Sequence, residues 1–222
     1  MSYDAIIFDF DGVLITGRAT PAGVYKTAVR EILEAYGVHN PDTWEKGLER
    51  PTDAAAFRER CEQRDLPPAE AWGYREAVST HIEETWLDRG DREPFPDTRV
   101  LSELAEKYTI GIASNNRHAL VGTCIERFGW TTIIDGHRGR YPTLTEYDRR
   151  KPNPRFVREM VQELGVTDPL YVGDRESDVV AAERVGCDSV YLRRESSHGA
   201  IDRTPTYEVT SLTELAEQLQ AP

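Results

Sequence analysis

Short runs of apolar residues, bounded by charged residues, glycine or proline, recur along the chain. The first occupies residues 5–8, and later runs occupy residues 108–113, 170–172 and 188–192. Uninterrupted apolar runs of this length are typical of strands that are buried on both faces. A further, shorter segment at residues 206–209 predicts an edge strand.

Helical patterns separate these runs. They occupy residues 100–107, 117–128, 154–164, 177–185 and 211–219. Glycine directly follows three of them, and Ser211 is a suitable N-cap for the last. Strands that alternate with helices of roughly 10–15 residues predict an α/β fold with a doubly wound parallel sheet.

The segment at residues 19–92 breaks this alternation, because it contains helical patterns and no convincing strand. Thr20 and Pro21 predict the start of a helix, Thr52 is the expected N-cap of the next, and Pro67 precedes a third. We therefore predict a helical domain at 19–92 inserted into an α/β core made of residues 1–18 and 93–222. Its large aromatic and imidazole side chains are expected to lie in its core: Trp72, Tyr74, His81 and Trp86.

The composition and net charge of the chain disfavour several classes of function. The 222 residues include 39 acidic and 27 basic side chains, for a net charge of −12, which disfavours binding to nucleic acid phosphates. Acidity combined with few lysines and many arginines suggests a salt-loving source, although a GC-rich genome also favours arginine. Residues 1–4 lack the basic start and apolar stretch of a signal peptide, and no apolar run reaches the roughly 20 residues that a membrane span needs, so we expect a cytoplasmic protein with no membrane partner. The three cysteines are far apart, so buried thiols are expected rather than a disulfide or zinc site.

Candidate catalytic residues lie where the predicted strands end, at the edge of a parallel sheet that binds ligands. Asp9 and Asp11 follow the first strand, and Gly12 permits a tight turn beside them. A carboxylate can attack phosphorus when a metal reduces its repulsion from the phosphate oxygens, and a second carboxylate can act as general acid and base. Alone, this motif is equally compatible with a solvated acidic turn.

Two polar segments could bind a phosphate. Ser114 and Asn115 follow the second strand and precede a helix, where hydroxyl, amide and backbone N–H groups suit an anion, although ordinary N-capping explains them as well. Lys151 precedes another helix, where its ammonium group could offset the charge of a phosphate and a nucleophile, or could simply lie at the surface.

A third acidic pair lies in the segment G-D-R-E-S-D at residues 173–178. Asp174 ends a predicted strand and Asp178 lies in the first turn of the next helix. Mg²⁺ is commonly bound by one or two carboxylates, water and a substrate phosphate. A favourable interaction with the helix dipole would explain Asp178 well and Asp174 less well.

Together, these segments resemble the haloacid dehalogenase-like hydrolase superfamily, in its phosphoglycolate phosphatase-like branch with a helical cap. The resemblance lies in D-F-D-G-V-L at residues 9–14, in Ser114, in Lys151 and in G-D-x-x-x-D at residues 173–178, in this order. It implies a Rossmann-like core, with residues 19–92 as a cap that excludes water and selects the substrate.

The resemblance also implies residue roles. Asp9 would form an aspartyl-phosphate, and Asp11 would be the acid and base, with its backbone carbonyl on Mg²⁺. Ser114 would bind the phosphoryl group and Lys151 would stabilise its charge. Asp174 would bind the metal, and Asp178 would support it directly or through water. The presence of Asp11 favours phosphate esters over carbon–halogen bonds, whose cleavage needs no acid for the leaving group.

The expected activity is Mg²⁺-dependent hydrolysis of small phosphorylated molecules by a monomer or homodimer. A sugar-phosphate mutase shares all four motifs and remains an alternative, as does a phospho-accepting signalling domain, although the large insertion argues against the latter. Four arginines between residues 135 and 150 could contact an anionic substrate or balance surface acids, and we favour the second: Arg138, Arg140, Arg149 and Arg150.

Overall fold

The computed structural model describes residues 3–16, 20–38, 45–194 and 201–220. Within these residues, six parallel strands form one sheet in the order β3-β2-β1-β4-β5-β6, which confirms the predicted doubly wound α/β fold. The strands are β1 (Ala5–Phe8), β2 (Thr109–Arg117), β3 (Gly136–Arg140), β4 (Pro169–Gly173), β5 (Asp188–Leu192) and β6 (Tyr207–Val209).

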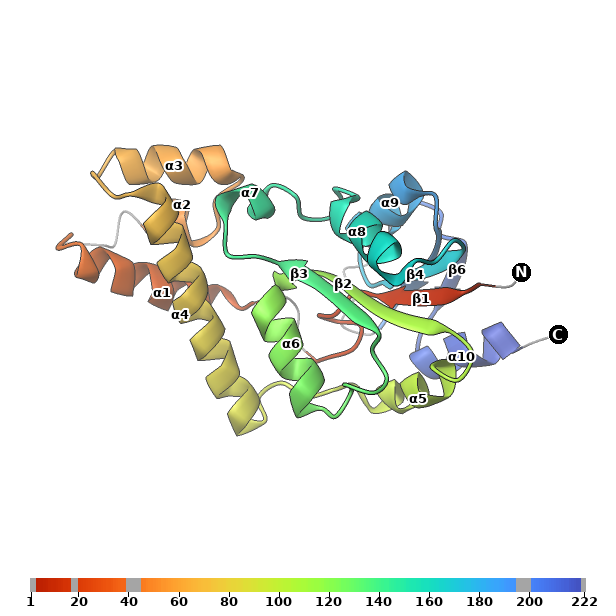
Figure 1. Cartoon of the computed structure of the whole chain (residues 1–222). Helices are drawn as coiled ribbons and strands as arrows, with labels where there is room; N and C mark the ends of the chain where they lie inside the picture. The colour runs from red at the N-terminus through yellow and green to blue at the C-terminus, as the bar shows by residue number, and fades with distance from the viewer. Residues whose placement is uncertain (1–2, 17–19, 39–44, 195–200, 221–222) are drawn as a thin grey trace.

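Helices cover both faces of the sheet (Figure 1). Ile6 and Phe8 of β1 pack on the face covered by α5, α6 and α10, and Ile7 packs on the opposite face against α8 and α9. This alternation follows from the two-residue period of a strand. The helices are α5 (Leu101–Leu104), preceded by a 3₁₀ turn at Pro96–Val100, α6 (His118–Arg127), α8 (Arg155–Leu164), α9 (Glu176–Val185) and α10 (Leu212–Gln220).

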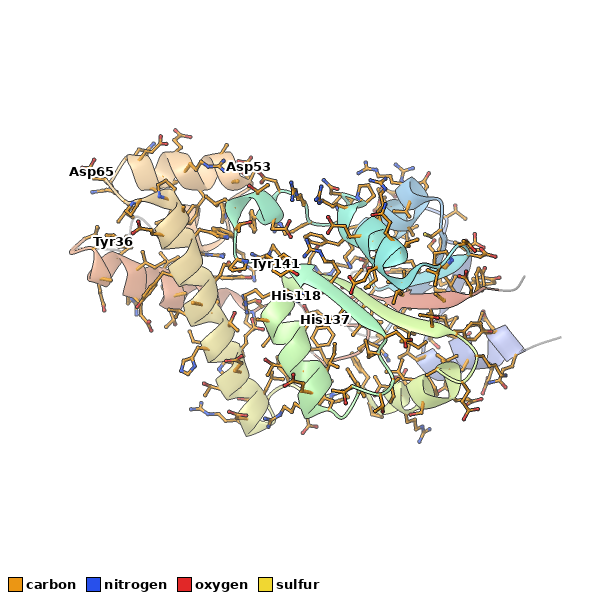
Figure 2. The ribbon with its side chains drawn as sticks, viewed as in Figure 1. Tyr36, Asp53, Asp65, His118, His137 and Tyr141 are labelled. Atoms are coloured by element: carbon orange, nitrogen blue, oxygen red, sulfur yellow. The ribbon has the colours of Figure 1, made fainter. Side chains whose placement is uncertain are left out.

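Strand β3 was not predicted from the sequence. Its residues, G-H-R-G-R, contain no apolar run, because β3 lies at the edge of the sheet and pairs only with β2. The ring of His137 on β3 stacks on that of His118 at 4.3 Å between centroids, with Tyr141 beside them (Figure 2). Neighbouring side chains thus stabilise a strand that hydrophobic patterning does not reveal.

Four further helices pack together beside the sheet (Figure 1). The domain bounds stay a prediction, and the proposed boundary at residues 18 and 19 lies outside the described residues. A short helix from the loop after β3, α7 (Leu144–Tyr147), contributes Leu144 and Tyr147 to the same apolar cluster. The four helices are α1 (Ala22–Ala35), α2 (Glu45–Glu49), α3 (Ala54–Glu62) and α4 (Pro68–Arg89).

The structure confirms one of the predicted helix N-caps and corrects another. Ser211 accepts a hydrogen bond from the backbone of Glu214 at 3.1 Å and so caps α10 as predicted. The cap of α3 is Asp53, which accepts from Ala56 N at 2.8 Å, and not Thr52 (Figure 2). Within the described residues, no helix is sufficiently long and apolar to span a membrane.

Trp72 is the centre of the helical cluster. It is fully buried, and its ring packs edge-on against Phe57 at 4.9 Å and Tyr147 at 4.8 Å between centroids. The expectation that Tyr74 and His81 are also core residues was wrong, because both side chains are exposed. A single tryptophan therefore joins α3, α4 and α7.

We expect Trp72→Ala to lower the free energy of unfolding by about 3–5 kcal/mol, because it removes a fully buried aromatic side chain. Tyr74→Ala, on the exposed face of the same helix, should change it by less than about 0.5 kcal/mol. Urea denaturation measures both values, and equal losses for the two variants would contradict this account of the cluster.

Candidate active site

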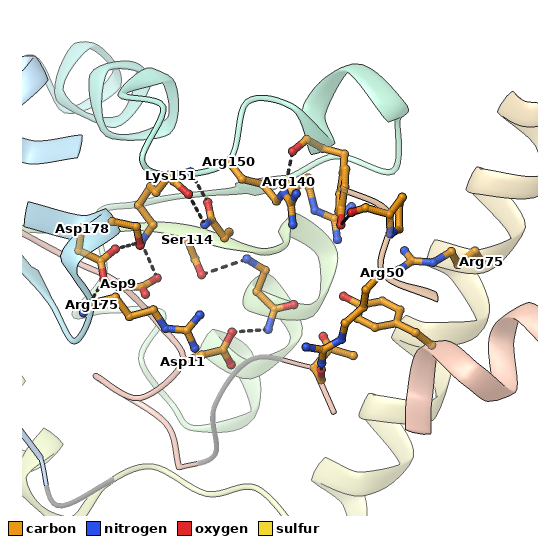
Figure 3. Close-up of a pocket in the computed structure, with 17 residues that line it drawn as sticks. Asp9, Asp11, Arg50, Arg75, Ser114, Arg140, Arg150, Lys151, Arg175 and Asp178 are labelled. Carbon is orange, nitrogen blue, oxygen red and sulfur yellow. Dashed lines mark hydrogen bonds and ion pairs between the residues drawn. The ribbon is translucent and has the colours of Figure 1, made fainter. Parts of the chain in front are cut away.

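The predicted site residues meet at the carboxyl ends of β1, β2 and β4 (Figure 3). Parallel strands bring these ends to the same edge of the sheet, although the residues are far apart in the sequence. A cavity of about 280 Å³ lies at this edge. Its lining includes six of the seven predicted residues: Asp9, Asp11, Ser114, Asn115, Lys151 and Asp178.

The ammonium group of Lys151 lies between two carboxylates. Its Nζ is 2.8 Å from Asp9 Oδ1 and 2.7 Å from Asp178 Oδ1, and the side chain is almost fully buried. Burial alone would lower the pKa of Lys151, but the charges of Asp178 and Asp9 outweigh it and hold this pKa well above its ordinary value. Lys151 is therefore a cation at all physiological pH values.

Tyr171 on β4 completes the surroundings of this ammonium group. Lys151 Nζ donates to the Tyr171 hydroxyl at 2.6 Å, and this hydroxyl donates to the carbonyl of Ala113 at 2.7 Å. Burial raises the pKa of Tyr171 well above its ordinary value, so the hydroxyl stays neutral. The sequence analysis missed Tyr171, because the only indication of its role is a hydroxyl group on a side chain within an otherwise apolar strand.

Asn115 and Ser114 lie within β2 and not after the strand as expected, and they make different contacts. Both amide atoms of Asn115 bind the backbone of Lys151, with Nδ2 donating to its carbonyl at 3.1 Å and Oδ1 accepting from its N–H at 2.7 Å. Asn115 therefore positions the lysine segment. The hydroxyl oxygen of Ser114 accepts from Asn116 N at 3.1 Å and lines the cavity.

Three carboxylates form an acidic cluster. One oxygen from each of Asp9, Asp174 and Asp178 lies within 4.8 Å of the others. Burial, followed by the charges of Asp9 and Asp178, raises the pKa of Asp174 to about 7. Burial together with Asp9 raises the pKa of Asp178 to about 6, despite the opposing effect of Lys151.

This cluster fits a hard divalent cation. The Oδ1 atom of Asp174 is buried, and none of the described residues gives it a hydrogen bond. A buried carboxylate oxygen without a donor is costly, and divalent cations such as Mg²⁺ bind such oxygens. Asp9, Asp174 and Asp178 are thus the residues that could hold a metal.

Two glycines of the motifs allow this close packing. Gly12 has φ of +81°, and a Cβ atom there would lie 2.4 Å from Asp174 Oδ2. A Cβ atom at Gly173 would lie 2.2 Å from Cβ of Asp178. Any larger residue at either position would displace a carboxylate of the cluster.

The carboxylate of Asp11 lies apart from the acidic cluster. It accepts a hydrogen bond from Asn116 Nδ2 at 2.8 Å and forms a buried ion pair with Arg92. Arg92 also pairs with Glu83 of α4 at 3.0 Å. The sequence analysis missed Arg92, because a charged linker looks the same whether its arginines are buried or exposed.

The four arginines between residues 135 and 150 divide into two pairs. Arg138 and Arg149 pair with Glu146, as expected for charge balance. Arg140 and Arg150 both line the cavity, and Arg140 pairs there with the buried Glu76 at 2.7 Å, so for these two the alternative of contact with an anionic substrate stays open. Nothing in their sequence spacing separates the two pairs, because Arg138 and Arg140 lie two residues apart on β3 and Arg149 and Arg150 are adjacent after α7. Only their tertiary surroundings decide which side chains reach the cavity.

Comparison with known proteins places this geometry in context. A phosphoglycolate phosphatase from Aliivibrio fischeri is 30% identical over 109 residues, which span 47% of this chain and 46% of that protein, about half of each. The structure of CbbY from Rhodobacter sphaeroides in complex with phosphate superposes with a TM-score of 0.67, at 18% identity over 96% of both chains. A 2-haloacid dehalogenase from Pseudomonas syringae pv. Tomato superposes with a TM-score of 0.63, at 19% identity over 98% of both chains.

At such low identity, the two structures show a shared fold and no more. The family model gives the stronger result, because the model described as haloacid dehalogenase-like hydrolase matches residues 3–186. This match covers most of the chain, including the ends of β1, β2 and β4 and the segment that carries Lys151. The chain therefore belongs to the haloacid dehalogenase-like hydrolases.

Proposed function

We propose that this chain hydrolyses small-molecule phosphomonoesters, with Asp9 as the nucleophile and Mg²⁺ as the cofactor. The observation that carries the proposal is the pairing of Asp9 with the buried ammonium group of Lys151 at one end of the cavity, with Asp11 two residues away and facing the same cavity. The similarity to a phosphoglycolate phosphatase over half of the chain supports a phosphate ester as substrate.

In the first step, an oxygen of Asp9 attacks phosphorus and forms the aspartyl-phosphate. The bond from phosphorus to the leaving oxygen breaks, and Asp11 gives a proton to that oxygen, so that the alcohol leaves neutral. The Ser114 hydroxyl and the Lys151 ammonium group would bind the phosphoryl oxygens, because both line the cavity beside Asp9.

In the second step, a water molecule attacks phosphorus and gives its proton to Asp11. The bond between phosphorus and Asp9 breaks, which restores the carboxylate and releases inorganic phosphate. Asn116 and Arg92 fix the orientation of the Asp11 carboxylate that accepts this proton. Protonated Asp11 regenerated in this way serves the next turnover.

Asp9, Asp174 and Asp178 would hold Mg²⁺, with Asp11 contributing its backbone carbonyl. When bound, Mg²⁺ would reduce the repulsion between the attacking carboxylate and the phosphate oxygens. The inserted helices, which we propose as a cap domain at residues 19–92, would keep bulk water from the aspartyl-phosphate. Thr20, Tyr25 and Arg75 from this segment line the cavity.

The Asp9→Asn variant should lose phosphatase activity by about 10⁴-fold or more, because the amide is not a nucleophile. Phosphate release from para-nitrophenyl phosphate with Mg²⁺, at low and high KCl, measures it, with mass spectrometry to exclude deamidation. Asp65→Asn, on an exposed turn remote from the cavity, is the matched control (Figure 2). Equal activity in Asp9→Asn and wild type would refute the mechanism, whereas isomerisation of a sugar 1-phosphate without phosphate release would favour a mutase.

Stabilisation of the protein by Mg²⁺ should increase with pH. In the metal-free protein, the raised pKa values of Asp174 and Asp178, about 7 and 6, mean that the folded state holds protons that the unfolded state has lost. The stability of the metal-free protein should therefore fall as pH rises from about 4 to 7. Mg²⁺ replaces these protons, so its effect should be small at pH 5 and large at pH 8.

At 100 times its Kd, Mg²⁺ should add about 2.7 kcal/mol, or roughly 5–11 °C in Tm. Thermal unfolding with and without MgCl₂ at both pH values measures this, and Asp174→Asn should abolish most of the increase. A shift of equal size at pH 5 and pH 8 would count against the acidic cluster as the metal site.

The Arg92→Met variant should lower the free energy of unfolding by about 3–5 kcal/mol, because it leaves Asp11 and Glu83 buried beside one cation fewer. Arg92→Lys retains the charge and should lose less. Arg89→Met, on an exposed residue at the end of α4, should cost less than about 0.5 kcal/mol. Urea denaturation compares the three, and a loss for Arg92→Met as small as that for Arg89→Met would contradict a structural role for the ion pair.

A further inference from the structure

The end of the cavity remote from Lys151 is lined by arginines. Figure 3 shows Arg140 and Arg150 near the middle of the cavity and Arg50 and Arg75 at the far end, with Ser114 between them and Asp178. These four residues, which we call the distal arginine cluster, come from separate segments: the end of α2, α4, the end of β3 and the residue before Lys151. Only tertiary folding brings them together.

Positive charge exceeds negative charge in this cluster. Glu76 is the carboxylate that opposes it, and it pairs with Arg140 at 2.7 Å and with Arg75. Among the described residues, no carboxylate lies within 4.0 Å of Arg50 or Arg150. Two of the four guanidinium groups therefore share Glu76, and the other two have no carboxylate partner among the described residues.

Neutral groups occupy the remaining contacts of Arg50 and Arg150. Arg50 donates to the carbonyl of Thr20 at 2.7 Å, and Arg150 donates to the carbonyl of Tyr147 at 2.6 Å. The guanidinium carbon of Arg150 also lies 3.3 Å from the centre of the Tyr147 ring. Stacking of this kind orients the plane of a guanidinium group and leaves other N–H groups available for an anion.

Within the cluster, Arg75 is buried, Arg150 is half-buried and Arg50 is exposed, and burial of a cation is costly. Burial lowers the pKa of Arg75, although Glu76 opposes the effect, and burial lowers the pKa of Arg150, with Arg140 adding to it. In Arg92 and Arg117, carboxylate partners outweigh burial and raise the pKa. Arg75 and Arg150 differ from these two arginines because the negative charge around them does not outweigh the effect of burial.

The cavity also has room for more than the phosphoryl group. Its volume of about 280 Å³ corresponds to roughly nine water molecules at about 30 Å³ each. Arg140 is almost fully buried, and no hydrogen bond from its Nε atom is found within the described residues. A ligand held at Asp9 would thus have space to extend toward unsatisfied, positively charged donors.

We propose that the distal arginine cluster binds a second anionic group of the substrate, a carboxylate or a second phosphate, in the part that leaves as the alcohol. This inference rests on the proposed function for the identity of the scissile group. The preferred substrates are therefore phosphomonoesters with a second negative charge, and esters of neutral alcohols are poor substrates. Arginine forks suit carboxylates and phosphates equally well, so the class comprises both.

Measurements of ligand affinity test the proposed role of the distal arginine cluster without requiring catalytic turnover. The dissociation constants of three ligands are measured by isothermal titration calorimetry with Asp9→Asn protein, in the presence of Mg²⁺ and at constant ionic strength. Ethyl phosphate has no second anionic group, phosphoglycolate has a carboxylate, and propane-1,3-diol bisphosphate has a second phosphate. Charge-assisted hydrogen bonds of about 1.5–3 kcal/mol correspond to roughly 10–150-fold tighter binding. We expect one or both doubly anionic probes to bind more tightly than ethyl phosphate by this factor. The probe that binds more tightly identifies the second anionic group as a carboxylate or a phosphate.

Arg50→Gln and Arg150→Gln, each added to Asp9→Asn, should reduce this preference about 10-fold and leave the Kd of ethyl phosphate within about 3-fold. Arg140 is less suitable, because its loss would leave Glu76 buried with one partner fewer. Arg193→Gln is the matched control for charge, since this arginine is 58% exposed and pairs with Glu208. It should leave all three Kd values unchanged.

Equal affinity for all three probes, no binding of either doubly anionic probe, or an equal loss for all probes in Arg50→Gln and Arg150→Gln would each overturn the proposal. These outcomes are separate from failure of the proposed function, which appears as phosphate release that survives Asp9→Asn. In the wild-type enzyme, the same preference should appear in kcat/KM for the doubly anionic esters.

Discussion

The ion pairs of Lys151 with Asp9 and Asp178 are the interaction on which the candidate active site depends. A parallel sheet brings the ends of β1 and β4 to one edge, and three carboxylates meet there. Without a buried cation, their mutual repulsion and desolvation would oppose folding. The amide of Asn115 and the hydroxyl of Tyr171 bind the lysine segment and thereby fix the position of this charge.

Burial, followed by the charges of Asp9 and Asp178, still raises the pKa of Asp174, so the ammonium group offsets only part of this negative charge. A divalent cation would offset the rest, so the affinity for Mg²⁺ that we propose and the destabilisation of the metal-free site would have the same cause. The distal end of the cavity presents the opposite case, with guanidinium groups in excess over Glu76. A ligand with two negative charges, bound together with a metal, would complement both ends at once.

Ionic contacts also join the inserted helices to the sheet domain. The middle of α4 buries Arg75, Glu76, Ser79 and Glu83, where an ordinary packing helix would bury apolar residues. Glu83 pairs with Arg117 at the end of β2 and with Arg92 in the return linker. The sequence pattern of α4 shows its length but not these ionic contacts.

The sequence by itself determined the fold class, the inserted helices and the residues that follow the strands, because apolar runs and glycine turns are local signals that survive in any tertiary context. It did not reveal β3, whose stability comes from pairing with β2 and from the stacking of His137 on His118. Nor did it separate Arg140 from Arg138, which lie two residues apart on β3: Arg140, at the end of the strand, lines the cavity, whereas Arg138 pairs with Glu146 and Glu159. Only the tertiary structure decided which charges are buried and which partners they have, since these depend on the surroundings of a side chain and not on its neighbours in the sequence.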